Sequence, residues 1–191
     1  MKKIFIDYER CVGCKACEIA CAVEHHPDKS IYTLVGDSKA FSNVRVIAID
    51  YINFASSCRH CNPAYCIDAC PSGALKRDEE TDAVIVDPYM CKACAMCAMT
   101  CPFDAIIFKK TYNSPFNRDY AVKCDFCTGR IKKGKLPACV ESCKTNALVF
   151  KEAREYVTKK EKKDLKAFLL GAPKEPENIR QYKELRKKVA G

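Results

Sequence analysis

Sixteen cysteines form four groups of four, and their spacing is typical of metal and iron–sulfur ligands. The first and third groups share the spacing C-x2-C-x2-C-x3-C, the second has x2-x4-x3, and the fourth has x2-x11-x3. The groups are Cys11, Cys14, Cys17 and Cys21; Cys58, Cys61, Cys66 and Cys70; Cys91, Cys94, Cys97 and Cys101; and Cys124, Cys127, Cys139 and Cys143.

This spacing suits cubane clusters better than single ions. Three thiolates on one tight loop can bind three irons of a cubane, and a fourth cysteine beyond that loop binds a neighbouring cluster. Each group therefore implies a partner group, and two reciprocal pairs predict four [4Fe–4S] clusters with all sixteen cysteines as iron ligands. Small residues between the thiols leave room for backbone N–H groups to approach sulfur; they are Gly13, Ala16, Ala93 and Ala95.

Two other uses of the cysteines compete with this interpretation. A disulfide scaffold requires an oxidising compartment. The opening MKKIFIDYER lacks the apolar core of about 7–15 residues that a secretory signal needs, and no run reaches the ~18 apolar residues of a membrane span. We therefore expect a cytoplasmic protein with reduced or metal-bound thiols and no transmembrane segment. The fourth group alone resembles a zinc ribbon, which leaves a zinc-binding regulatory module as an alternative of another class.

The formal net charge of +9 would by itself indicate a nucleic-acid or anionic-lipid partner. A [4Fe–4S] core held by four thiolates carries about −2, so four clusters contribute about −8 and the sum is about +1. We therefore expect no nucleic-acid partner. Residues 151–191 hold 13 Lys or Arg against 7 Asp or Glu. This tail is either a pair of solvated helices or a docking surface, so peripheral membrane association stays open.

Catalytic chemistry is not indicated. The sequence contains neither GxGxxG nor GxxxxGK[ST], and we find no nucleophile with its base. His25, His26 and His60 are the three histidines, and only His60 lies within a cysteine group, CRHC. Four cysteines already complete that group, so we expect His60 on the surface or around a cluster. The chain is therefore predicted not to be an enzyme itself.

Short strands are predicted on both sides of the cysteine groups. Residues 2–9, 44–52, 105–108 and 147–150 are apolar or β-branched runs, and the polar DEETD within 73–88 predicts a β-hairpin. In the tail, Thr158 is predicted to cap a helix through Leu170, and a second helix is predicted from about Glu175 to Val189. These elements indicate the α+β class.

Four segments resemble, in order, the four-cluster ferredoxin-like electron-transfer subunits that accompany molybdopterin oxidoreductases, formate dehydrogenases and hydrogenases. They are CVGCKACEIACAVEH, CRHCNPAYCIDACPSGAL, CKACAMCAMTCPFDAI and KCDFCTGRIKKGKLPACVESC. Within this family, KIFIDYERCVGCKACEIACAVEHHPDKSIY most resembles the iron–sulfur protein that takes electrons from nickel carbon monoxide dehydrogenase. Lys144 follows the fourth group where many relatives have proline, and its charge is expected to raise the potential of the nearby cluster.

The resemblance implies that the first group pairs with the fourth and the second with the third. The four ligand sets are then Cys11, Cys14, Cys17 and Cys143; Cys124, Cys127, Cys139 and Cys21; Cys58, Cys61, Cys66 and Cys101; and Cys91, Cys94, Cys97 and Cys70.

The same resemblance implies two bacterial-type two-cluster ferredoxin modules, one inserted in the other. Residues 1–40 and 111–150 would form the outer module, 41–110 the inner module, and 151–191 a basic helical extension. KIFI would then pair with ALVF, and IAIDYI with AIIF.

The function implied by the resemblance is a relay of single electrons through four [4Fe–4S] clusters. The expected partners are carbon monoxide dehydrogenase on one side and a hydrogenase or an NAD(P)H-linked flavoprotein on the other. The iron–sulfur subunit of a formate or aldehyde oxidoreductase is the alternative.

Overall fold

The computed structural model of the chain describes residues 2–112, 114–158 and 161. Within them the strands are β1 (Lys2–Ile6), β2 (Val44–Ile49), β3 (Ile52–Ser57), β4 (Leu75–Arg77), β5 (Val84–Val86), β6 (Ile107–Lys109), β7 (Tyr120–Val122) and β8 (Leu148–Glu152). The α-helices are α1 (Ala16–His25), α2 (Tyr65–Asp68), α3 (Met96–Met99), α4 (Thr128–Ile131) and α5 (Ala138–Glu141). Three 3-10 turns lie at η1 (Tyr8–Arg10), η2 (Tyr32–Leu34) and η3 (Pro115–Asn117). These short elements make an α+β protein, as the sequence indicates.

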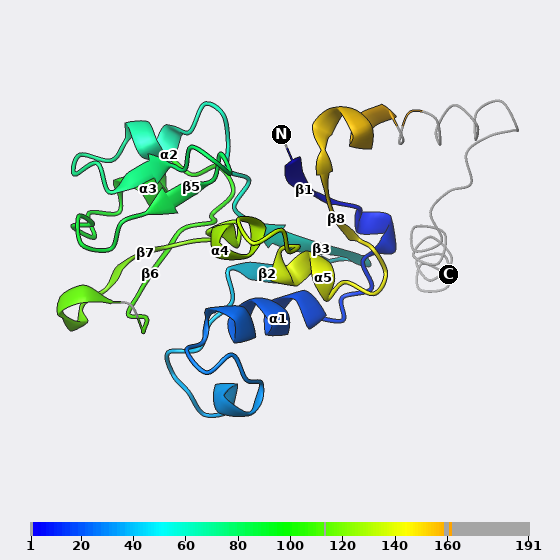
Figure 1. Cartoon of the computed structure of the whole chain (residues 1–191), viewed down its shortest axis with the longest axis horizontal. Coiled ribbons are helices and arrows are strands. Elements are labelled where there is room, and N and C mark those ends of the chain that lie inside the picture. The colour runs from blue at the N-terminus through cyan, green and yellow to red at the C-terminus, as the bar shows by residue number, and fades with distance from the viewer. Residues whose placement is uncertain (1, 113, 159–160, 162–191) are drawn as a thin grey trace, which may run out of the picture.

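The strands of the described residues form four antiparallel pairs: β1 with β8, β2 with β3, β4 with β5, and β6 with β7. The predicted pairing of KIFI with ALVF is confirmed, with Ile4 opposite Phe150. Figure 1 shows these two strands side by side, although they come from opposite ends of the described chain. The predicted hairpin within 73–88 is also confirmed, with Leu75 opposite Val86.

The predicted pairing of IAIDYI with AIIF is wrong. The strand expected over 44–52 ends at Ile49, and Asp50 takes left-handed backbone geometry with φ of 52°. The chain turns back there, so β2 pairs with β3 along Val44–Ile49 and Ile52–Ser57. The strand expected over 105–108 begins at Ile107 and pairs instead with β7. Asp adopts left-handed geometry more readily than most residues, so a tight turn forms where the sequence appeared continuous.

Two hydrophobic cores organise the elements. One contains residues of α1, β2, β3 and β8: Cys17, Cys21, Val44, Ala55 and Leu148. The other lies around α3 and the β4–β5 and β6–β7 pairs: Ala64, Ala74, Leu75, Val84, Cys91, Cys97, Ile106, Tyr120, Ala121 and Val122. In Figure 1 the elements of the second core lie together at one end of the molecule, and α1, α5 and the β2–β3 hairpin lie beside them. Both cores contain cysteines, so packing and ligand placement depend on the same residues.

The tail is described only at its start. Residues 153–158 are helical, so Thr158 lies within a helix that it was predicted to cap. The remaining predictions, a helix to Leu170 and another from about Glu175 to Val189, lie outside the described residues. Among the residues that are described, no helix has the length and apolar character required to cross a membrane.

Candidate metal centres

The four cysteine loops share one backbone feature, a left-handed residue two positions after the first cysteine. These residues are Gly13, His60, Ala93 and Phe126, with φ of 70°, 47°, 55° and 64°. In three loops this turn brings the backbone N of that residue close to the Sγ of the first cysteine: 3.5 Å from His60 to Cys58, and 3.4 Å both from Ala93 to Cys91 and from Phe126 to Cys124. A backbone N–H aimed at sulfur favours the thiolate that binds iron.

Other segments donate further N–H groups to sulfur. The backbone N of Asn43 lies 3.3 Å from Sγ of Cys21, and that of Leu148 lies 3.5 Å from Sγ of Cys143. In the second core, the backbone N of Ala121 lies 3.4 Å from Sγ of Cys91. Strands β7 and β8 and the segment before β2 therefore complete the surroundings of these sulfurs. These donors suit an anionic sulfur site, which a [4Fe–4S] cluster provides.

The structure brings the last cysteine of the first group to the fourth group. Burial raises the pKa of the Cys139 thiol, and the negative charge of Cys21 raises it further. The same holds for Cys124, whose pKa is raised by burial, by Asp125 and by Cys21. Cys21 thus lies near cysteines more than a hundred positions away in the sequence.

The remaining cysteines of these two groups lie around the first core. Cys17 is buried in it and Cys143 packs against it. Burial raises the pKa of Cys17 to about 11, with a smaller contribution from the charge of Cys11. Cys14 is exposed on its loop. The predicted set of Cys11, Cys14, Cys17 and Cys143 therefore has one member at the surface and one in the core.

The last cysteines of the second and third groups each lie near a cysteine of the other group. Burial raises the pKa of the Cys66 thiol, Lys123 partly offsets this, and the charges of Cys58 and Cys101 raise it further. Burial likewise raises the pKa of Cys97 to about 11, with contributions from Cys91 and Cys70. Cys101 therefore lies near the second group and Cys70 near the third, and Cys94 is exposed.

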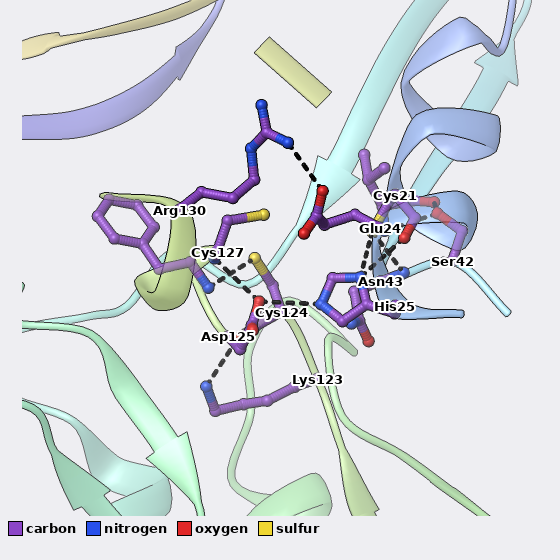
Figure 2. A network of polar contacts seen from close by, with 12 residues as sticks. Cys21, Glu24, His25, Ser42, Asn43, Lys123, Cys124, Asp125, Cys127 and Arg130 are labelled. Atoms are coloured by element: carbon purple, nitrogen blue, oxygen red, sulfur yellow. Dashed lines mark hydrogen bonds and ion pairs between the residues drawn. The ribbon is translucent and has the colours of Figure 1, made fainter. Parts of the chain in front are cut away.

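Helix α1 is joined to the fourth group by two ion pairs, both drawn in Figure 2. Nη1 of Arg130 lies 2.8 Å from Oε2 of Glu24, and Nε2 of His25 lies 3.1 Å from Oδ1 of Asp125. Nδ1 of His25 lies 2.7 Å from the carbonyl oxygen of Cys21. These contacts hold Cys21 beside the loop that begins at Cys124, and the sequence pattern did not indicate any of them.

His60 is buried beside the cysteines of the second group, with 1% of the residue exposed. Its Nδ1 accepts the backbone N–H of Val84 at 2.9 Å. Burial, assisted by the positive charges of Lys123 and Lys3, lowers its pKa to about 2, so the ring is neutral. The ring packs on Phe126 with centroids 4.7 Å apart. His60 and Phe126 occupy the same position in the second and fourth loops, so this contact joins the two loops.

A single metal ion needs several ligands around one point. Within the described parts of the chain, no group of three or more His, Cys, Asp or Glu side chains is arranged to hold one metal ion. All sixteen cysteines are described, and none forms a disulfide. The donors from separate loops, together with the N–H groups aimed at sulfur, fit the geometry of clusters shared between loops.

Comparison with known proteins also indicates 4Fe-4S clusters. A 4Fe-4S dicluster domain matches residues 49–153, and a 4Fe-4S binding domain matches residues 2–23. One subunit of the anaerobic dimethyl sulfoxide reductase of Escherichia coli (strain K12) is 38% identical over 152 residues, which are 76% of this chain and 71% of that protein. Protein NrfC of the same organism is 36% identical over 149 residues, 75% of this chain and 62% of that protein.

Proposed function

The chain belongs to the family of 4Fe-4S dicluster proteins, and on this premise we propose that it holds four [4Fe–4S] clusters. The proposed ligand sets are Cys11, Cys14, Cys17 and Cys143; Cys124, Cys127, Cys139 and Cys21; Cys58, Cys61, Cys66 and Cys101; and Cys91, Cys94, Cys97 and Cys70. The observation that carries this proposal is the proximity of Cys21, Cys70 and Cys101 to cysteines of other groups.

The chain is an iron–sulfur electron-transfer subunit of the oxidoreductase type and not itself a catalytic enzyme. A [4Fe–4S] cluster supplies one-electron uptake and release when it is bound. The protein contributes cysteine ligands, N–H groups that stabilise the sulfur, and packing that limits water. Cys14 and Cys94 lie at the surface, which supports entry and exit of electrons at the first and third groups.

We propose an outer module formed by both ends of the chain and an inner module formed by its middle. The pairing of β1 with β8 supports this arrangement, as do the two separate cores. The two hydrophobic cores do not divide at the predicted module boundaries, which lie between residues 40 and 41 and between residues 110 and 111. Val44 and Ala55 pack in the core with α1, and β7 packs with the middle segment.

Nickel carbon monoxide dehydrogenase is the proposed electron donor, and a hydrogenase or an NAD(P)H-linked flavoprotein is the proposed acceptor. This choice is supported by the resemblance of residues 3–32 to the iron–sulfur protein that takes electrons from that dehydrogenase. A second candidate partner is an oxidoreductase of the dimethyl sulfoxide reductase type, which the 38% identity with a subunit of that enzyme favours. The cytoplasmic location is part of the proposal and rests on the need to keep sixteen cysteines reduced.

Anaerobic purification of the whole chain tests the cluster content. We expect brown protein with about 16 Fe and about 16 sulfide per chain. Colourless protein with about four Zn and no sulfide would reject the proposal in favour of a zinc module.

Affinity capture from cells grown anaerobically tests the partner. A nickel enzyme recovered with the chain supports carbon monoxide dehydrogenase, whereas a molybdenum or tungsten enzyme selects the second candidate or a formate or aldehyde oxidoreductase.

A further inference from the structure

Lys123 is a buried cation at the junction of the second and fourth cysteine loops. It directly follows β7 and precedes Cys124, and only 5% of the residue is exposed. Its Nζ donates to the carbonyl oxygen of Cys124 at 2.9 Å and to that of Val84. Figure 2 shows Lys123 beneath Cys124, with its amine directed back to the backbone of that loop.

Both of these carbonyl partners are neutral. Among the described residues, no carboxylate forms an ion pair with Nζ of Lys123. Lysine is almost never buried without a compensating charge, because leaving water costs the ion several kcal/mol. Two carbonyl oxygens satisfy its hydrogen bonds and leave its net charge uncompensated. The Asp125 carboxylate lies two residues away in the sequence, but it already pairs with His25 at 3.1 Å. The proposed cluster sites at this junction are therefore the groups that can supply the compensating negative charge.

Cysteines from two proposed ligand sets lie near Lys123. Cys124 is its neighbour in the sequence, and Cys66 is close enough for the lysine charge to oppose the effect of burial on the pKa of that thiol. Val84 connects Lys123 with His60, since its carbonyl accepts from Lys123 and its N–H donates to His60. The ring contact between His60 and Phe126 closes the same junction.

We propose that Lys123 is a counter-charge shared by two clusters, the one held by Cys124, Cys127, Cys139 and Cys21 and the one held by Cys58, Cys61, Cys66 and Cys101. This inference rests on the proposed ligand sets. Each of these sites carries about −2 when oxidised and about −3 after taking up one electron. A buried positive charge favours the more negative form and so raises the reduction potentials of both clusters. Lys123 is a tuning residue and binds no iron.

Lys123→Met tests the proposal when compared with a matched variant, Lys144→Met. Each variant removes one positive charge from a lysine next to a proposed ligand, but Lys144 is exposed and water screens its charge. Anaerobic titration of the whole chain with dithionite, which donates the electrons, is followed by electron paramagnetic resonance. In Lys123→Met we expect two of the four reduction steps to lose at least tenfold in their equilibrium constants, which is about 59 mV. In Lys144→Met we expect a much smaller change in potential. The rise in cluster potential that the sequence predicts from the charge of Lys144 should therefore be small.

Unchanged potentials in Lys123→Met with full iron content would overturn the proposal, and a shift in one step alone would contradict the sharing. If Lys123→Met does not retain iron, Lys123→Gln and Lys123→Arg decide the question. Gln keeps a donor without charge, and Arg keeps the charge. Iron retained in Arg but not in Gln supports the counter-charge, whereas loss in both, or normal potentials in Gln, rejects it. Wild-type protein without iron would instead count against the proposed function.

Discussion

Nε2 of His25 lies 3.1 Å from Oδ1 of Asp125, although the two residues are 100 positions apart. Nδ1 of the same ring lies 2.7 Å from the carbonyl oxygen of Cys21, so both ring nitrogens face acceptors and the ring is a cation. Burial alone would lower the pKa of His25, but the Asp125 carboxylate and Cys21 raise it to about 12. This ion pair and the one between Glu24 and Arg130 therefore hold the end of α1 against the fourth cysteine group.

We predict that His25→Gln weakens the site that contains Cys21. The substitution removes the charge and breaks the contact with Asp125, which should lower the free energy of unfolding by about 1–2 kcal/mol. Iron should also leave the protein faster in the presence of a chelator, since Cys21 is no longer held beside Cys124. Thermal unfolding and the rate of iron release, both measured anaerobically, check these two effects.

His26→Gln is the matched control. His26 is also buried, at 5% exposure, and its Nε2 pairs with Asp37 at 3.3 Å. Among the described residues its ring forms no hydrogen bond with a cysteine, so this variant should lower the melting temperature without changing the rate of iron release. Equal rates of iron release in the two variants would show that His25 acts only on general stability.

Pairs of cysteine substitutions test the sharing of ligands between groups. Cys66→Ala and Cys101→Ala should each remove up to one cluster, about four Fe per chain. Combined, they should still remove no more than about four Fe per chain, because both cysteines are proposed to bind one cluster. Cys66→Ala combined with Cys70→Ala should remove the sum of the two losses, although these cysteines are neighbours in the sequence. Iron analysis with circular dichroism to confirm folding measures this, and the reverse pattern would exclude the proposed sets.

Several features could be predicted from the sequence because local patterns encode them. The cysteine groups are defined by spacing, the hairpin at 75–86 by a polar turn between apolar runs, and the strand at 2–6 by its apolar residues. Ala93, expected to let an N–H approach sulfur, does so at Cys91. The left-handed turn common to all four loops could not be predicted, because only the first loop has glycine at that position and the other loops have His60, Ala93 and Phe126.

Other features could not be predicted because they depend on distant contacts. The turn at Asp50 has no Gly or Pro to mark it, so β2 and β3 appeared as one strand followed by a loop. The His25–Asp125 pair and the burial of Lys123 against Val84 join residues 100 and 39 positions apart. The spacing of residues within a motif does not predict such contacts, because they form only when segments distant in the sequence pack against each other.

We predict that the loop of the first group accepts alanine at Gly13 but not valine. Gly13 has φ of 70°, and an added Cβ would lie 2.7 Å from Oδ1 of Asn53, a side chain that can turn away. Ala93 occupies the same position in the third loop, so Gly13→Ala should cost only about 1 kcal/mol and keep the iron. A β-branched residue is a severe outlier at this φ, so Gly13→Val should lose about four Fe per chain. Full iron content in Gly13→Val would show that the turn is not needed.

The last prediction concerns Asp78, which connects the β4–β5 turn to α4. Its Oδ1 accepts the backbone N–H of Thr81 at 2.9 Å, and its Oδ2 lies 2.9 Å from Nζ of Lys132. The hydrogen bonds from Thr81 and the pair with Lys132 lower the pKa of Asp78 from 3.8 to about 2. A carboxyl with a lowered pKa in the folded state stabilises the protein fully above about pH 4 and loses this effect as the pH falls towards 2.

Asp78→Asn should therefore lower the melting temperature by about 2–4 °C, and by the same amount at pH 6 and at pH 9. Asn can still accept the hydrogen bonds from Thr81. The fall in melting temperature therefore measures the contribution of the ion pair between Asp78 and Lys132. The pKa of Lys132 is raised, chiefly by its hydrogen bond with Asp78, so the lysine stays charged at pH 9. Glu80→Gln is the control, because Glu80 is 70% exposed at 3.5 Å from the same lysine and should have no measurable effect. A difference that disappeared between pH 6 and pH 9, or an equal loss in Glu80→Gln, would contradict the assignment of this stability to Asp78.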